Sequence, residues 1–273
     1  MPSDPLRVLE EACSLAARFY PPAERVLSSC TLVGLPFSLS TGSDELPHAY
    51  FYQVALWLEH KGQLYLPGAG TACLEHASCS YAPLVLVREA CLEREAPLLV
   101  AASLLHEVLH LERYPIYTRK VLELVREQGL TREEAVARVV PEEEREVEAL
   151  LAGLAARHRE LGEAMLDADL VERSICLEDA LRGRVAPWST FRHVMNFYVF
   201  LNRSAFRVHT CFRELRELLL LDARAKEELY RALSEEERER HAERVRRLLE
   251  AAGELEVSWV LRWRPGRQAG GQA

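Results

Sequence analysis

An apolar run interrupted by three titratable side chains constrains this chain more than any other feature. Residues 98–113 read LLVAASLLHEVLHLER, and the segment from Ala96 to Glu112 is apolar on nearly every side of a helix. A helix that is apolar all round is normally buried within a domain. The sequence therefore predicts a core helix that carries His106, Glu107 and His110 in its middle.

The spacing of these three side chains is the H-E-x-x-H pattern. Residues four apart in a helix project from the same face, so both imidazoles can bind one metal ion, and Glu107 can reach a water on that ion. Without a metal, each of the three buried polar groups would need its own hydrogen-bond partner, which is a costly arrangement. We therefore expect a zinc ion (Zn²⁺) bound by His106 and His110, with Glu107 as the catalytic general base.

The chain before this helix predicts one helix and a small sheet. Apolar residues fall on one side of a helix from Pro5 to Tyr20. The stretches YFYQVALWLEH, QLYLPG and PLVLVRE are rich in aromatic and branched residues and are separated by turns, which favours strands. Together they indicate an α+β protein: a mainly helical domain with a small antiparallel or mixed sheet before the H-E-x-x-H helix.

Helix signals divide the second half of the chain. Tyr114-Pro115 is expected to end the core helix, and Thr131 to open a later one through a capping box. Pro141 suits the first position of a further long helix, PEEEREVEALLAGLAARHRELGEAML. A helical C-terminal region with a loose tail is expected to follow, giving a catalytic domain over residues 1–183 and a second region over residues 184–273.

Composition excludes several classes of protein. Of 273 residues, 49% are apolar and 28% charged, which is the balance of a globular protein. A net charge of −8 argues against a nucleic-acid partner, since phosphate binding relies on lysine and arginine. The longest apolar stretch, Pro97 to Leu105, is too short for a membrane span of about 20 residues. Seven cysteines, an odd number, and an N-terminus without a secretory pattern favour the cytoplasm.

The H-E-x-x-H helix and its surroundings resemble the zincin metallopeptidases. The resemblance rests on PLVLVRE, a short connection and a buried helix with uncharged residues around His106. It implies that this strand is an edge strand beside a peptide or protein substrate. Glu112 departs from the pattern, because zincins usually prefer a hydrophobic residue there.

A downstream segment carries the expected third ligand. Arg145 to Gly153 reads REVEALLAG and resembles the third-ligand helix R-E-x-E-A-D-x-x-G of the gluzincins, as in the heat-shock and prenyl-protein protease branch and the ImmA-like peptidases. The resemblance implies that Glu146 is the third zinc ligand. Leu150 replaces the aspartate that orients a ligand histidine in those families, so the orienting group is left open.

Helical phase supports a competing ligand. Glu143 lies inside the apolar stripe of the same helix, whereas Glu146 lies on its border, so Glu143 is the alternative. The group that stabilises the oxyanion is also open among His193, Tyr198, His209, Tyr114 and Tyr117. The predicted function is zinc-dependent peptide hydrolysis. The alternative is a catalytically inactive zincin-like module that binds a protein partner, which the missing aspartate at Leu150 favours; the oligomeric state is not predicted.

Overall fold

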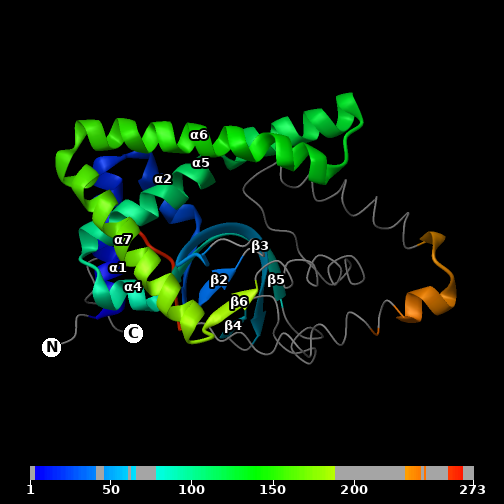
Figure 1. The fold of residues 1–273 in the computed structure, drawn as a ribbon, viewed down its shortest axis with the longest axis horizontal. Helices are drawn as coiled ribbons and strands as arrows, with labels where there is room; N and C mark the ends of the chain where they lie inside the picture. The colour runs from blue at the N-terminus through cyan, green and yellow to red at the C-terminus, as the bar shows by residue number, and fades with distance from the viewer. Residues whose placement is uncertain are drawn as a thin grey trace.

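The computed structural model describes residues 4–40, 46–60, 63–65, 78–187, 231–240, 243 and 258–266. It has helices packed around a small mixed sheet, which confirms the α+β class (Figure 1). The helices are α1 (Pro5–Phe19), α2 (Pro22–Ser29), α4 (Glu89–Arg94), α5 (Pro97–Gln128), α6 (Arg132–Arg157) and α7 (Arg159–Leu181). The strands are β1 (Thr31–Leu35), β2 (Ser38–Ser40), β3 (Tyr50–His60), β4 (Gln63–Tyr65), β5 (Ser78–Arg88), β6 (Val185–Pro187) and β7 (Trp259–Leu261).

The larger sheet within the described residues has the strand order β4-β3-β5-β1-β7. β5 runs parallel to β1 and antiparallel to β3, so the sheet is mixed. The expectation that the PLVLVRE strand lies at an edge is wrong, because β5 has a neighbour on each side and its residues 84–87 are fully buried. The open edge belongs to β3: β4 covers only Leu58–His60, and the described part of the chain shows no strand beside Tyr50–Trp57 on that side.

The core helix α5 is longer than predicted. It continues through Pro115 to Gln128 and ends at Gly129, whose φ of 65° is the left-handed conformation that glycine adopts at low cost. A proline inside a helix removes one backbone hydrogen bond. Apolar residues beyond it, such as Val121 and Leu122, compensate by packing against α6. The prediction that Tyr114-Pro115 ends the helix is therefore wrong.

Helices α6 and α7 also differ from the predicted boundaries. Thr131 does form the capping box that opens α6, but the helix passes through Pro141 without a break. The predicted helix from Pro141 to Leu166 is instead divided at His158, whose ring packs edge-on against Phe19. The turn between α6 and α7 thus lies where His158 contacts the N-terminal helix. The local sequence pattern does not include this contact.

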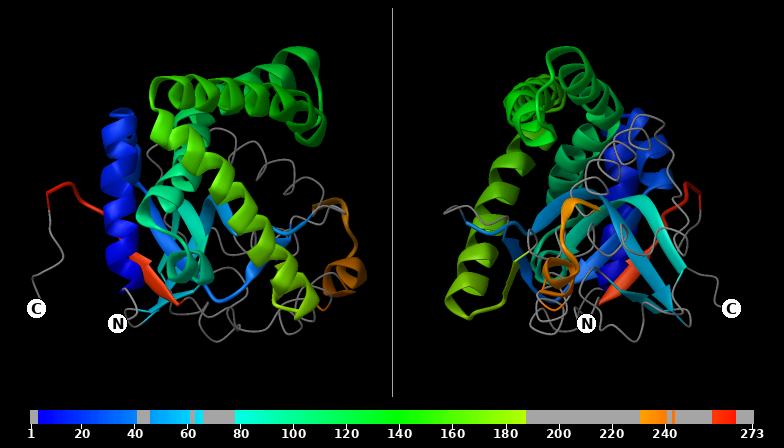
Figure 2. Two further views of the ribbon diagram at one scale, coloured as in Figure 1. Left: turned by 60° about the vertical axis from the view of Figure 1, so that its left-hand side comes forward. Right: turned by 90° about the vertical axis from the view of Figure 1, so that its right-hand side faces the viewer.

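Helix α5 lies among the other helices, as its apolar surface requires. It packs against α1, α6 and α7 and also touches β3 (Figure 2). Val100, Leu104, Leu105, Val108 and Leu109 are fully buried. The histidine pair therefore sits on a helix held on several sides, which keeps both rings in fixed positions.

Residues after position 183 add strands to both sheets. β6 pairs with β2, and β7 pairs with β1. Residues 235–240, within the stretch predicted to be helical from Ser234 to Glu250, are helical. The predicted helix from Thr190 to Leu221 and the tail from Arg267 to Ala273 lie outside the described residues, as do the predicted oxyanion candidates His193, Tyr198 and His209.

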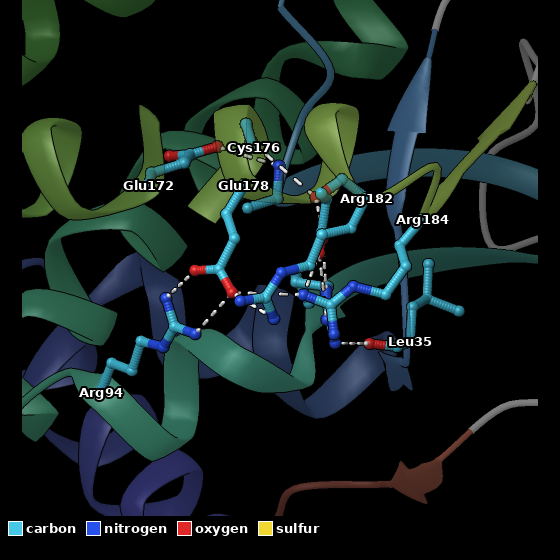
Figure 3. A network of polar contacts seen from close by, with 11 residues as sticks. Leu35, Arg94, Glu172, Cys176, Glu178, Arg182 and Arg184 are labelled. Atoms are coloured by element: carbon cyan, nitrogen blue, oxygen red, sulfur yellow. Dashed lines mark hydrogen bonds and ion pairs between the residues drawn. The ribbon is translucent and has the colours of Figure 1, made fainter. Parts of the chain in front are cut away.

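A buried ion-pair network, called here the arginine cluster, fixes α7 against the sheet. It consists of Arg88, Asp179, Ser38 and Arg184. Arg88 Nε donates to Asp179 Oδ2 at 2.7 Å, and Ser38 Oγ donates to the same oxygen at 2.7 Å. Arg184 lies 3.0 Å from Asp179 Oδ1. Nearby, Glu178 bridges α7 to Arg94 of α4 at 2.8 Å (Figure 3).

Candidate metal centre

Two imidazole nitrogens from α5 face each other at the centre of the candidate site. His106 Nε2 and His110 Nε2 lie 3.0 Å apart. Two nitrogens bound to one tetrahedral zinc ion at about 2.0–2.1 Å would lie roughly 3.3 Å apart. Glu144 of α6 places its Oε2 3.6 Å from His110 Nε2, and the ligand atoms of these three residues all lie within 4.8 Å of one another. His106, His110 and Glu144 could therefore hold one metal ion.

Glu143 occupies the opposite side of the His110 ring. Its Oε1 lies 3.1 Å from His110 Nδ1, and both side chains are buried. Ligand histidines in metal sites commonly donate their second N–H to a carboxylate, which fixes the tautomer and the direction of the ring. With the proton on Nδ1, His110 Nε2 is free to face an ion. Glu143 thus provides an orienting carboxylate, although it does not stand at the position of the gluzincin aspartate, which is Leu150 in this chain. We call His106, His110, Glu143 and Glu144 the histidine cluster.

Tyr52 of β3 contacts three members of the site at once. Its ring stacks on that of His110, with centroids 4.8 Å apart and planes 10° apart. Its hydroxyl donates to Glu143 Oε1 at 3.2 Å, and its backbone N–H donates to Glu107 Oε2 at 2.8 Å. The open edge of β3 therefore fixes the ring, the orienting carboxylate and the expected general base together.

Glu107 is buried beside these groups, and only 8% of its surface is exposed. Burial raises the pKa of its carboxyl to about 7, and the Tyr52 N–H and the neighbouring His110 oppose this shift only in part. A general base works best when its pKa lies near the working pH. In the metal-free protein Glu107 is thus poised to take up or release a proton near neutrality.

Burial and nearby charges shift the pKa values of the two histidines in opposite directions. Burial lowers the pKa of His106 to about 4, and the nearby His110 and His48 add to the effect. His106 is therefore neutral near pH 7, as a metal ligand must be. Burial would also lower the pKa of His110, but the hydrogen bond with Glu143 and the surrounding carboxylates raise it overall.

A pocket of about 570 Å³ opens beside the histidine cluster. His106 and Glu107 line it from α5, and α7 forms the opposite wall. Leu46, Met165 and Leu151 contribute apolar surface, while Glu172 and His48 contribute polar groups. A peptide segment entering this pocket would reach the side chain of the expected base.

The structure does not bring Glu146 to the histidines. Its Oε2 lies 3.8 Å from Arg113, and its side chain is 44% exposed. Glu143 and Glu144 lie nearer, Glu143 on the Nδ1 side of His110 and Glu144 on the Nε2 side. Leu150 is partly buried against the hydrophobic core rather than joined to the histidine cluster.

Two other sequence features have structural explanations. Glu112, where zincins prefer a hydrophobic residue, accepts a hydrogen bond from Tyr20 and pairs with Arg25 at 3.6 Å, so it ties α1 and α2 to the core helix. Among the described oxyanion candidates, Tyr114 lies edge-on to Tyr52, and Tyr117 is buried in a separate cluster with Val121.

Sequence reasoning missed Glu144, Tyr52 and His48. A signal for Glu144 existed, because it is next to Glu143 in a run of three glutamates. Tyr52 carried a weaker signal, since a strand rich in aromatic residues does not reveal which ring stacks on a histidine. His48 had none, because it reaches the pocket through the pairing of its backbone with Leu39.

Comparisons with known proteins do not assign this chain to a family. The chain matches no protein-family model, no curated protein and no solved structure. Among the described residues, no helix has the length and apolar character needed to cross a membrane.

Proposed function

We propose that this protein is a zinc-dependent metallopeptidase. His106, His110 and Glu144 would hold the ion, and Glu107 would act as the general base. The observation that carries the proposal is the pair of imidazole nitrogens 3.0 Å apart beside a pocket that Glu107 also lines. Glu144 replaces the sequence-based choice of Glu146 because its carboxylate lies nearer to the histidines.

Each residue has a defined task in this proposal. A bound zinc ion would act as a Lewis acid and lower the pKa of its water toward ~7. Glu107 would accept the proton from the attacking water and pass it to the leaving amine. Glu143 would keep the proton of His110 on Nδ1, and Tyr52 would hold Glu107 and Glu143 in place.

The arrangement favours an enzyme over an inactive module. The inactive alternative drew on the loss of an orienting aspartate at Leu150. Glu143 supplies a carboxylate at His110 Nδ1, so this reason for an inactive site disappears. A buried carboxyl with a pKa near 7 next to paired histidines is also a feature of catalytic sites more than of binding surfaces.

Metal content and hydrolysis test the proposal together. We expect about one zinc per native chain and none in His110→Ala. Glu107→Gln should keep its zinc, because its amide oxygen can still accept from the Tyr52 N–H, but should lose peptide hydrolysis by about 100-fold or more. Glu127→Gln, an exposed position on the same helix, is the matched control and should behave as native.

Two results would overturn the proposal. Equal zinc content in the native protein and in His110→Ala would remove the metal site. Native rates of peptide hydrolysis in Glu107→Gln would remove the general base, even with zinc bound.

A further inference from the structure

The open edge of β3 holds two carboxylates that line the same pocket. Tyr52 N–H donates to Glu107, and two residues earlier Tyr50 N–H donates to Glu172 Oε1 at 3.3 Å. Ala49 N–H donates to the same oxygen of Glu172 at 3.2 Å. Residues two apart in a strand are separated by roughly 7 Å and project their N–H groups from the same edge. Glu172 therefore lies about the length of two peptide residues from the expected general base.

No ion pair is found for Glu172 among the described residues, although the charge of Arg173, which also lines the pocket, acts on its carboxyl. Asp169, which lines the same wall, is paired with Arg173 through both carboxylate oxygens, at 2.9 and 3.0 Å. Within the described residues, Glu172 accepts hydrogen bonds only from these two backbone N–H groups, and both bind the same oxygen. Burial raises the pKa of its carboxyl, and the N–H groups of Tyr50 and Ala49 and the charge of Arg173 oppose this shift only in part.

The position of Glu172 on α7 is fixed by its neighbours. Figure 3 shows Glu172 on the same helix as Cys176 and Glu178. Glu178 is tied to Arg94 of α4, and Asp179 is buried against Arg88. The helix that carries Glu172 is therefore anchored at its C-terminal end, and the carboxylate is presented to the pocket from a rigid element.

We propose that Glu172 selects substrates with a positively charged group one or two residues from the scissile bond. This inference rests on the proposed function and names its substrate class. The cationic group would pair with the Glu172 oxygen that no backbone N–H occupies. The apolar walls from Leu46, Leu151 and Met165 would cover the methylene groups of a long basic side chain. The charge could belong to a lysine or arginine side chain or to a free peptide N-terminus.

Binding measured without hydrolysis tests the inference directly. Zinc-loaded Glu107→Gln protein is titrated with peptide pairs that differ only in lysine or norleucine at one position, so that chain length is equal and charge is not. We expect the lysine peptide to bind 10- to 100-fold more tightly. Adding Glu172→Gln should bring this ratio close to one, while the new amide oxygen still accepts from Ala49 and Tyr50. Glu163→Gln, exposed on the same helix, is the matched control and should keep the ratio.

The peptide set also separates the two sources of charge. Each pair is made with a free and with an acetylated N-terminus. If acetylation abolishes the preference and lysine does not matter, Glu172 recognises the N-terminal amine. If lysine matters in acetylated peptides, Glu172 recognises a basic side chain. Either result supports the inference.

Failure of this inference can be distinguished from failure of the proposed function. Equal binding of charged and uncharged peptides, or a preference that persists in Glu172→Gln, overturns the inference even if the native protein hydrolyses peptides. A preference that depends on Glu172, in a protein whose native form hydrolyses none of them, supports the inference as a binding property and counts against the peptidase.

Discussion

The arginine cluster and the histidine cluster each bury one carboxylate, Asp179 and Glu143, but only the first contains permanent cations to balance it. Arg88 and Arg184 surround Asp179. Burial alone would raise the pKa of Asp179, yet the hydrogen bonds from Arg88 and Ser38 lower it overall. In the histidine cluster, burial lowers the pKa of His106 to about 4, so that ring supplies no charge near neutrality. Despite burial, the pKa of His110 is raised by its hydrogen bond with Glu143 and by the nearby carboxylates, so any positive charge of this cluster depends on the protonation of one ring.

The difference in permanent positive charge shows what the histidine cluster lacks. In the arginine cluster, each charged group is paired with an opposite charge. The histidine cluster leaves two imidazole nitrogens turned toward each other with a carboxylate beside them. A divalent cation would give this cluster a permanent positive charge, as the arginines give the arginine cluster. Four predictions test the comparison, from the largest expected effect to the smallest.

Removing the buried cation should cause the largest loss. Arg88→Met leaves Asp179 buried without its main partner, and we expect the free energy of unfolding to fall by about 3–5 kcal/mol. Urea unfolding of metal-free protein measures this loss. Arg94→Met, which breaks a partly exposed pair with Glu178, should cost at most about 1 kcal/mol. Replacing both partners, as in Arg88→Met with Asp179→Leu, should recover much of the stability.

Equal losses in Arg88→Met and Arg94→Met would show that the arginine cluster is no more important than a surface ion pair. The contrast between the two clusters would then have no energetic basis.

A buried carboxyl that has no ion pair in the described part of the chain should make stability depend on pH. Burial raises the pKa of Glu95 from 4.5 to about 7, so the folded protein binds a proton that the unfolded chain has lost. This stabilisation is present below about pH 4.5 and disappears as the pH rises to about 7, a change of roughly 3 kcal/mol. Urea unfolding at several pH values in this range should give a flatter profile for Glu95→Gln than for the native protein.

Glu93→Gln is the control for this measurement, because Glu93 is exposed on the same short helix. If Glu95→Gln and the native protein share one pH profile, Glu95 is ionised in the fold, and it belongs with Asp179 rather than with the uncompensated groups.

Two neighbouring glutamates of α6 should differ in their effect on zinc. Glu144→Ala should weaken zinc binding by about 100-fold or more, which corresponds to about 2.7 kcal/mol, because its carboxylate lies beside both histidines. Glu146→Ala should change the affinity little, because that carboxylate lies near Arg113. Competition with a chromophoric chelator measures both. The opposite ranking would restore Glu146 as the third ligand.

Loss of a single hydroxyl should have the smallest effect. Tyr52→Phe keeps the ring on His110 and the backbone N–H on Glu107, but removes the hydrogen bond to Glu143. Partners behind a metal ligand typically contribute 10- to 100-fold in affinity, and we expect about tenfold weaker zinc binding here. Native zinc affinity in Tyr52→Phe would mean that Glu143 is held in place without it.

The local patterns predicted the elements better than their ends. The strand from Tyr50 to His60 agrees with its richness in aromatic and branched residues, and the helix from Pro5 follows the periodicity of its apolar residues. Both internal prolines misled the helix boundaries, because a proline lowers local helix stability while packing elsewhere can compensate. The part of α5 beyond Pro115 is held by contacts with α6, the next helix, which the pattern around Pro115 does not include.

The candidate site likewise has one part that local sequence predicts and another that depends on tertiary packing. His106, Glu107 and His110 share one helix, so their relative positions follow from helical spacing alone. The partner on α6 depends on how α5 and α6 pack, because Glu144 and Glu146 lie about 200° apart around α6 and cannot both face the histidines. Helical phase indicated that Glu143 is buried, but not which ring nitrogen it faces.

By itself, the sequence determined that α5 is buried and that two imidazoles and a carboxylate lie on adjacent faces of it, because side-chain spacing within a helix is fixed by its geometry. Only the tertiary structure decided that Glu143 and Tyr52 hold His110, that Glu144 completes the cluster, and that Glu172 lines the pocket. Those choices depend on the packing of segments distant in sequence, which no local pattern specifies.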